Sequence, residues 1–409
     1  MPAVTVLMLD ELPRPPHSLL ASLESEGVGV VGWGLADLLS APLAELPKVE
    51  VLMAPARVPP VSVAAVAHRL RLTGGPVPIV LVYAEDGFEA LEEHVRRGHD
   101  FLVPPFLPAL VRSRLQDCSE RARAHAHAER MSYERELEIG REIQAGFLPE
   151  QLPTPEGWSI EVSFRPARQV AGDFYDVFEL VHRRRLALVV ADVCDKGVGS
   201  ALFMALIRTL LRHTAEYSGL QHLVAGGQDL GALYPVGVTP MMNAVLGTNH
   251  YLTRNHLRQG YFATLFFCVL DPATGSLVYI NGGHNAPRLI AQESGELSAL
   301  EVTGPAVGLL PDSTFGLGYA HMEPGDTLFV YTDGVPEARC PDGRFLGEER
   351  MLALLTEPAA DGKELLDRVG RAVLEHTGGG EQHDDVTMMV VQRGALAGTG
   401  PAEQAVAAA

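Results

Sequence analysis

The stretch RLALVVADVCDKGVGSALFMALIRTLLR, residues 185–212, specifies a strand, an acid and a helix in close succession. Residues 186–191 are all apolar, which is typical of a strand buried on both faces. Glycines then interrupt the pattern, and apolar residues recur at helical spacing from about residue 200 to 212 or 217. Asp192 lies between the two segments, where packing gives no reason for a carboxylate. The pattern therefore predicts an acid at an exposed corner between a strand and a helix.

Three further acids lie at the ends of predicted strands. Asp173 precedes an apolar segment, Asp333 follows the strand 327–332, and Asp384 precedes an apolar run that begins at residue 386. Antiparallel pairing of these strands would bring all three acids, together with Asp192, to one rim. Carboxylates gathered in one place repel each other unless a cation offsets their charge. Oxygen ligands favour Mg²⁺ or Mn²⁺ over Zn²⁺, and two such ions sharing a carboxylate would fit.

The overall composition limits the class of protein. The 409 residues, of which 47% are hydrophobic and 20% charged, suit a globular chain of two or three domains. A formal net charge of −19 argues against binding to nucleic acid or to an anionic membrane surface. The four cysteines are far apart, which indicates neither disulfides nor a cysteine zinc site and favours a reducing compartment. Without an apolar run of ~20 residues or a signal-peptide core, we expect a soluble cytoplasmic protein.

Residues 1–118 alternate between short predicted strands and helices, which predicts an α/β domain of the flavodoxin-like class with a parallel sheet. With acids after its first strand and GHDFLVPPF near its end, this segment resembles the receiver domain of response regulators. Ala54 stands where a receiver has its phosphoacceptor aspartate, and Pro104 stands where it has a lysine. Neither side chain can do that chemistry. We therefore expect a degenerate receiver-like domain used for docking or dimerisation.

Residues 119–150 are expected to be a helical linker, part of a charge-rich helix predicted from about residue 107 to 147. Ile139, Ile143 and Phe147 would lie on one face of this helix. Two interpretations remain open. The helix packs on its own domain, or it forms a parallel coiled coil in a homodimer that also uses the N-terminal domain.

The segment 151–394 has a different composition, in which predicted strands dominate. It includes two long helical stretches and a hairpin at residues 262–280. This mixture favours an α+β domain in which a β-sandwich is flanked by helices. Residues 395–409 contain mostly glycine, alanine and proline, and we expect a disordered tail.

A set of motifs in a fixed order makes a family resemblance specific. The motifs are ELEIGREIQAGFLP at 136–149, GDFYD at 172–176, ADVCDKGVGSALFMA at 191–205, FATLFF at 262–267, INGGHNAP at 280–287, YTDGVPEA at 331–338 and HDDVT at 383–387. Together they resemble the SpoIIE/RsbU branch of the metal-dependent protein serine/threonine phosphatases, the PPM family. The resemblance covers about residues 132–393 and implies the PPM-type fold for that part of the chain.

The resemblance also implies metal ligands and catalytic acids at particular positions. Asp192 matches the aspartate that bridges two Mn²⁺ or Mg²⁺ ions, and the backbone carbonyl of Val193 matches an additional oxygen ligand. Asp173 matches a ligand from the first strand. Asp333 and Asp384 match the pair that holds the other ion.

Five other residues near these motifs have open roles. Asp176 and Asp385 would be water-mediated ligands or partners of the ligands. Asp195 departs from the Gly or Ser of many relatives and adds negative charge. His284 would either donate to phosphate or stabilise its turn, and Lys196 would either contact the anion or remain a solvated surface residue.

The resemblance implies hydrolysis of phosphoserine or phosphothreonine on a regulatory protein, by attack of a hydroxide that bridges the two ions. The implied substrate is an anti-sigma-factor antagonist of the STAS type in a partner-switching pathway. The alternative is a non-catalytic signalling adaptor whose phosphatase-like domain only binds partners. The presence of all four acids favours the enzyme, because an adaptor has no need for charges that repel each other.

Overall fold

The computed structural model describes residues 5–11, 14–75, 77–180, 183–224, 238–380 and 382–395, and the side chains of 219–224 are left undescribed. Apart from residue 395, the tail expected at 395–409 lies outside these ranges. The chain divides into two compact units, and the boundary falls between Glu136 and Leu137. Within the described ranges, no helix has both the length and the apolar character needed to cross a bilayer.

The N-terminal unit contains a sheet of five parallel strands in the order β2-β1-β3-β4-β5. The strands are β1 (Thr5–Leu9), β2 (Gly29–Trp33), β3 (Val51–Pro55), β4 (Ile79–Tyr83) and β5 (Asp100–Leu102). The connecting helices are α1 (His17–Ser25), α2 (Leu35–Ser40), the 3₁₀ turn η1 (Leu43–Glu45), α3 (Pro60–Arg71) and α4 (Glu89–Arg96). The predicted parallel sheet is therefore confirmed.

Both faces of this sheet are covered, which explains its apolar strands. Alternate residues of β1, β3 and β4 pack against α2 and α3 on one face, and against α1 and the first turns of α5 (Pro108–Ala145) on the other. Ala54 is fully buried in β3. One of the acids after β1, Glu11, accepts a 2.9 Å hydrogen bond from the backbone N–H of Leu35, at the first residue of α2. That acid therefore has a structural partner.

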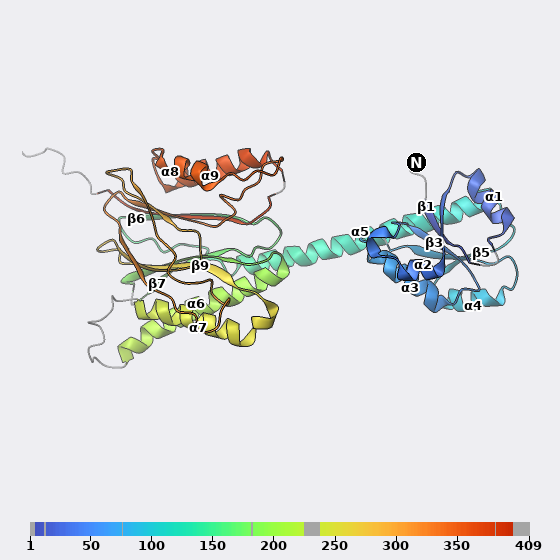
Figure 1. Cartoon of the computed structure of the whole chain (residues 1–409), viewed down its shortest axis with the longest axis horizontal. Coiled ribbons are helices and arrows are strands. Elements are labelled where there is room, and N and C mark those ends of the chain that lie inside the picture. The colour runs from blue at the N-terminus through green and yellow to red at the C-terminus, as the bar shows by residue number, and fades with distance from the viewer. Residues whose placement is uncertain are drawn as a thin grey trace, which may run out of the picture. The chain divides into compact units, whose positions relative to one another are not determined.

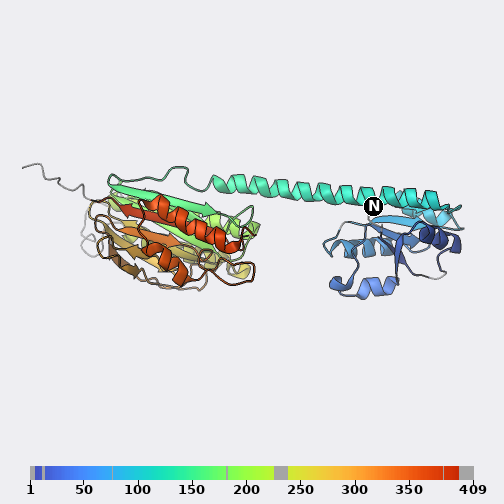
Figure 2. The same cartoon turned by 90° about the horizontal axis from the view of Figure 1, so that it is seen from above.

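Helix α5 is continuous over 38 residues and crosses the boundary between the units (Figure 2). Its first turns are anchored on the N-terminal unit by the buried residues Val111, Leu115 and Cys118. Further along, Ile139 and Ile143 are exposed. The first turns therefore pack on the N-terminal unit, and for the later turns packing on their own domain stays a prediction. The coiled coil remains a prediction.

The C-terminal unit contains two antiparallel sheets of five strands each, in the orders β13-β10-β9-β8-β7 and β12-β11-β14-β15-β6. The first sheet contains β7 (Phe174–Leu180), β8 (Arg185–Val193), β9 (Ala263–Leu270), β10 (Ser276–Gly282) and β13 (Gly318–His321). The second contains β6 (Trp158–Arg165), β11 (Arg288–Ile290), β12 (Leu297–Ala299), β14 (Thr327–Tyr331) and β15 (Val386–Arg393).

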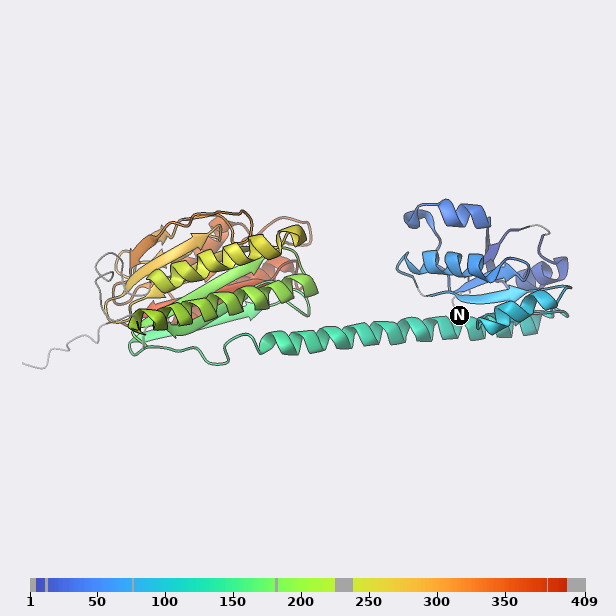
Figure 3. The same cartoon turned by 90° about the horizontal axis from the view of Figure 1, so that it is seen from below.

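Helix pairs cover the outer faces of the two sheets (Figure 1). Helices α6 (Val198–Val224) and α7 (Val238–Asn255) lie side by side on the first sheet, as Figure 3 shows from below, and the 3₁₀ turn η2 (Leu257–Gln259) follows them. Helices α8 (Glu348–Thr356) and α9 (Gly362–Thr377) cover the second sheet. The predicted sandwich flanked by helices is confirmed. Helix α6 ends at Val224, beyond its predicted end at residue 212 or 217, and Leu211 and Ala215 pack on the core.

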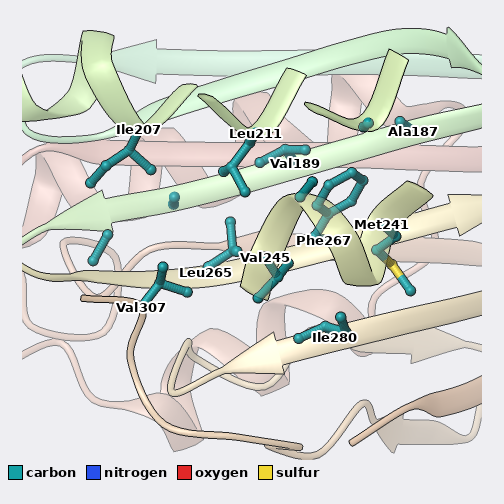
Figure 4. Packing of buried hydrophobic residues seen from close by; sticks show 14 of the residues in the cluster. Ala187, Val189, Ile207, Leu211, Met241, Val245, Leu265, Phe267, Ile280 and Val307 are labelled. Carbon is teal, nitrogen blue, oxygen red and sulfur yellow. The ribbon is translucent and has the colours of Figure 1, made fainter. Parts of the chain in front are cut away.

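Strand β8 has a different core on each of its faces. Ala187 and Val189 point toward α6 and α7, where they meet residues such as Ile207 and Met241 (Figure 4). Leu186, Leu188 and Val190 point the other way, into the core between the two sheets. The predicted burial of this strand on both faces is confirmed. Asp192 is the penultimate residue of β8, which ends at Val193, and it is partly buried. The prediction of an exposed corner beyond the strand is therefore wrong in this detail.

Candidate metal centre

The first sheet brings Asp173 and Asp192 together. Phe174 of β7 pairs with Ala191 of β8, so Asp173 and Asp192 are the next residues along these neighbouring strands. Each carboxyl group lies close enough to influence the pKa of the other. Sheet register alone therefore places two of the predicted acids side by side.

The second sheet supplies Asp333 and Asp384 to the same rim. Tyr331, at the end of β14, pairs with Met388 near the start of β15. Asp333 comes after β14 and Asp384 comes before β15, so both acids lie at the same end of this strand pair. The negative charges of Asp333 and Asp384 both act on Asp192 of the first sheet. The structure therefore gathers all four predicted acids where the two sheets meet.

Asp173 is the most buried of the four acids, with 1% of its surface exposed. One of its oxygens accepts hydrogen bonds from the hydroxyl groups of Thr332 (2.8 Å), directly after β14, and Thr387 (2.6 Å), in β15 of the other sheet. Burial and the carboxylates of Asp192 and Asp385 raise the pKa of Asp173 well above its usual range, and the two hydroxyls oppose this rise. The two threonines thus fix its orientation.

The pKa values of Asp192 and Asp333 are also raised by burial and by neighbouring carboxylates. Burial, followed by the charges of Asp333 and Asp384, raises the pKa of Asp192 to about 7. Burial, Asp384 and Glu337 raise the pKa of Asp333 to about 6, and Lys196 opposes that rise. A cluster of carboxylates that resist ionisation in each other's presence suits hard divalent cations, which supply the missing positive charge. The donor set therefore fits Mg²⁺ or Mn²⁺.

The acids gather at the rim without converging on one point. Among the described residues, no three His, Cys, Asp or Glu side chains are arranged closely enough to hold a metal ion as they stand. Both threonine hydroxyls bond to a single oxygen of Asp173, and Asp384 forms a 2.8 Å ion pair with Lys196. Ion binding at Asp384 would therefore require Lys196 to move away, whereas Asp173 has a second oxygen available to an ion.

The backbone around Val193 is tightly packed against the loop that carries Asp173. A Cβ atom on Gly172 would lie 2.7 Å from the carbonyl oxygen of Val193. Glycine at this position therefore lets the loop approach the predicted carbonyl ligand closely.

Asp385 stabilises that same loop. One carboxylate oxygen accepts a 2.7 Å hydrogen bond from the N–H of Ala167, and the other accepts from Gly172 (2.7 Å) and Asp173 (3.4 Å). Asp385 is thus a structural partner of a predicted ligand, which is one of the two roles that the sequence left open.

Asp176 has a different structural role. It is 1% exposed and forms ion pairs with Arg208 (3.0 Å) and Arg212 (3.1 Å) of α6. Burial raises the pKa of Asp176, and the two arginines oppose that rise. These contacts tie β7 to α6, and they direct the carboxylate toward the helix.

Gln144 near the end of α5 is a site residue that sequence reasoning missed. Its side-chain amide donates to the carbonyl of Ala171 (2.7 Å) and accepts from the N–H of the same residue (2.9 Å). This double hydrogen bond connects α5 to the loop before Asp173. The signal was present in the sequence, because Gln144 lies within the motif at 136–149.

His284 and Cys194 have packing roles. His284 is 2% exposed, and its ring forms a 2.8 Å hydrogen bond with the Thr264 hydroxyl. Its backbone N–H donates to the side-chain oxygen of Asn281 (2.8 Å). Burial lowers the pKa of His284 to about 4, against a smaller opposing effect of a backbone carbonyl. It is therefore a neutral histidine that stabilises its turn. Burial also raises the pKa of the Cys194 thiol, whose sulfur accepts a hydrogen bond from Phe262.

Comparison with known proteins gives the family. The family model described as Stage II sporulation protein E (SpoIIE) matches residues 182–394, just over half of the 409 residues. The chain belongs to the SpoIIE family. Its C-terminal unit has the fold of PP2C-type phosphatases: the SiaA-PP2C domain of Pseudomonas aeruginosa matches 65% of this chain and 98% of its own, with a TM-score of 0.50 at 20% identity.

Two curated relatives are similar over the same part of the chain. Protein IcfG of Synechocystis sp. is 42% identical over 268 residues, which cover 63% of this chain and 41% of that protein. The phosphoserine phosphatase RsbU of Bacillus subtilis is 24% identical over 259 residues, which cover 63% of this chain and 70% of that protein. The chain therefore spans less than half the length of IcfG.

Proposed function

We propose that this protein is a metal-dependent protein serine/threonine phosphatase that acts on a phosphorylated regulatory protein. The observation that carries the proposal is the meeting of four acids from two sheets at one rim, each sheet contributing two. Membership of the SpoIIE family and similarity to a protein named a phosphoserine phosphatase support the same chemistry.

In this proposal the acids would hold two Mn²⁺ or Mg²⁺ ions. Asp173 and the carbonyl of Val193 would be ligands of one ion, Asp333 and Asp384 would be ligands of the other, and Asp192 would be shared between them. Bound divalent ions supply positive charge that lowers the pKa of water and offsets the charge of phosphoryl oxygens.

The surrounding residues position these ligands. Thr332 and Thr387 orient the carboxylate of Asp173, and Asp385 holds the backbone of its loop. Gln144 fixes the start of the loop from α5.

We propose further that the substrate is an anti-sigma-factor antagonist of the STAS type in a partner-switching pathway. The similarity to RsbU, a protein named a phosphoserine phosphatase, supports a phosphoserine as the target, and the resemblance of the motif set to the SpoIIE/RsbU branch implies the STAS-type protein that carries it. A phosphorylated serine or threonine on such a protein would place its phosphate at the rim, next to the connection between β8 and α6.

The N-terminal unit is proposed to be a degenerate receiver-like domain, residues 1–118. Its strand order is the one that flavodoxin-like doubly wound sheets have. The proposal continues with a linker at 119–150, a phosphatase domain at 151–394 and a tail at 395–409. The exposed Ile139 and Ile143 on α5 support a homodimer formed through the N-terminal domain and this helix.

Hydrolysis of an aryl phosphate and of a phosphoserine peptide by the purified chain tests the proposed activity. We expect turnover only with Mn²⁺ or Mg²⁺, and we expect Asp192→Asn to lower the rate by about 100-fold or more, since loss of a ligand exceeds loss of its supporting contacts. Asp367→Asn, on the exposed face of α9, is the matched control and should retain full activity. Full turnover after exhaustive chelation, or an unaffected Asp192→Asn, would contradict the proposed metal site. Absence of turnover at any metal concentration would contradict the proposed activity and favour an adaptor.

A further inference from the structure

Lys196 places a positive charge among the acids of the rim. Its ammonium nitrogen lies 2.8 Å from a carboxylate oxygen of Asp384 and also donates to the carbonyl of His383. Its charge reaches Asp333 as well and opposes the rise of that pKa. A single ammonium group therefore acts on both acids of the pair that is proposed to hold one ion.

The loop around Lys196 is built to direct this side chain back toward the rim. Asp195 and Gly197, on either side of it, have positive φ angles of 70° and 96°. The side chain of Asp195 accepts a 2.8 Å hydrogen bond from the N–H of Lys196. A non-glycine residue with positive φ is uncommon and needs local support, which this hydrogen bond provides. The unusual backbone and the ion pair thus belong to one arrangement.

The ammonium group and a divalent ion compete for the same oxygens. Both require the negative charge of Asp384, and repulsion disfavours their presence together at close range. The Lys196 side chain is 35% exposed and that of Asp384 is 36% exposed, so the lysine can leave toward solvent without opening the core.

We propose that Lys196 is a built-in counter-cation that neutralises Asp384 and Asp333 until a divalent ion displaces it. It thereby sets the ion concentration at which the site fills. This inference rests on the proposed function, because it assigns these two acids to a metal ion. It adds a regulatory element that none of the ligands supplies: the resting charge of the site is balanced from within the chain.

Isothermal titration of the full chain with Mn²⁺ tests this inference directly. We expect Lys196→Met to lower the Kd for Mn²⁺ by about fivefold, because Mn²⁺ would no longer have to break the ion pair with Asp384. A partly exposed ion pair can change a binding constant by about this factor. Lys196→Arg keeps the charge and should stay near wild type. Lys363→Met, at an exposed position on α9, is the matched control and should leave the Kd unchanged.

Amine labelling followed by mass spectrometry provides a readout that does not depend on activity. Saturating Mn²⁺ should release Lys196 and raise its labelling rate, while the rate of Lys363 stays constant. An unchanged Kd in Lys196→Met, or labelling of Lys196 that does not respond to Mn²⁺, would overturn the inference.

Aryl phosphate hydrolysis separates this inference from the proposed function. If the wild type binds Mn²⁺ with the expected lysine effect and yet hydrolyses nothing, the proposed phosphatase is wrong and the role of Lys196 stands. If the wild type is active, and Lys196→Met raises the KM for the phosphate ester at an unchanged Kd for Mn²⁺, then Lys196 binds substrate and the inference is wrong. Failure of the wild type to bind Mn²⁺ would overturn both.

Discussion

Asp176→Asn should strongly destabilise the C-terminal unit. Asp176 is only three residues from the predicted ligand Asp173, but its contacts are structural. The variant keeps the shape of the side chain but removes the charge that pairs with Arg208 and Arg212. Removing one partner of a buried ion pair costs about 3–5 kcal/mol, because the other charge remains buried without compensation. Arg208 bears most of this effect, since its side chain is only 12% exposed.

The expected loss lies at the low end of that range. Arg212 is 35% exposed and retains a 3.0 Å pair with Glu216, so its share is small. A loss of about 3 kcal/mol corresponds to a fall in Tm of roughly 6–12 °C for a domain of this size. Scanning calorimetry and urea unfolding of the full chain at pH 7.5 would measure it.

Two further variants make this prediction decisive. Asp342→Asn disrupts an exposed pair with Arg344 and should leave the Tm close to that of the wild type, because solvent screens such a pair. The double variant Asp176→Leu with Arg208→Met removes both charges and should recover much of the lost stability. A Tm for Asp176→Asn within 2 °C of wild type, measured beside an equally stable Asp342→Asn, would refute the reasoning.

Three other predictions follow from single residues. The pKa of His284 is about 4 in the folded chain and roughly 6.5 in the unfolded chain, so the folded state binds a proton less readily. The stability contributed by this group is therefore complete above about pH 6.5. It is lost as the pH falls toward 4, by up to about 3 kcal/mol. His284→Gln should remove that part of the pH dependence of unfolding, and identical pH slopes in the two proteins would contradict it. Gly334→Ala should lower kcat at least tenfold, because the added Cβ would lie 1.9 Å from the carbonyl oxygen of Asp385 and displace the loop of Asp333. An unchanged kcat would show that this loop can move without loss of activity. Acetyl phosphate should leave residues 1–118 unmodified because Ala54 and Pro104 stand at the acceptor and lysine positions, and a phosphoaspartate found there by mass spectrometry would show a wrong alignment.

Local sequence patterns determined the elements and the positions of the acids. The apolar run at 186–191 predicted a strand covered on both faces, and β8 indeed has one core toward α6 and another toward the second sheet. The acids at strand ends predicted a common rim, because side-chain alternation and antiparallel pairing are short-range rules that a sequence displays. Their order along the chain also carried the family resemblance.

The tertiary structure alone decided what the neighbouring polar groups do. The sequence left Asp176 and Asp385 as possible ligands or partners, and only folding showed one paired with α6 and the other holding the loop of Asp173. Asp385 lies 213 residues from Gly172 in the chain, and Thr387 lies 214 residues from Asp173. No local pattern encodes such contacts, because they form only when two sheets pack face to face. For the same reason, the ion pair between Lys196 and Asp384 became visible only once β8 and β15 met at one rim.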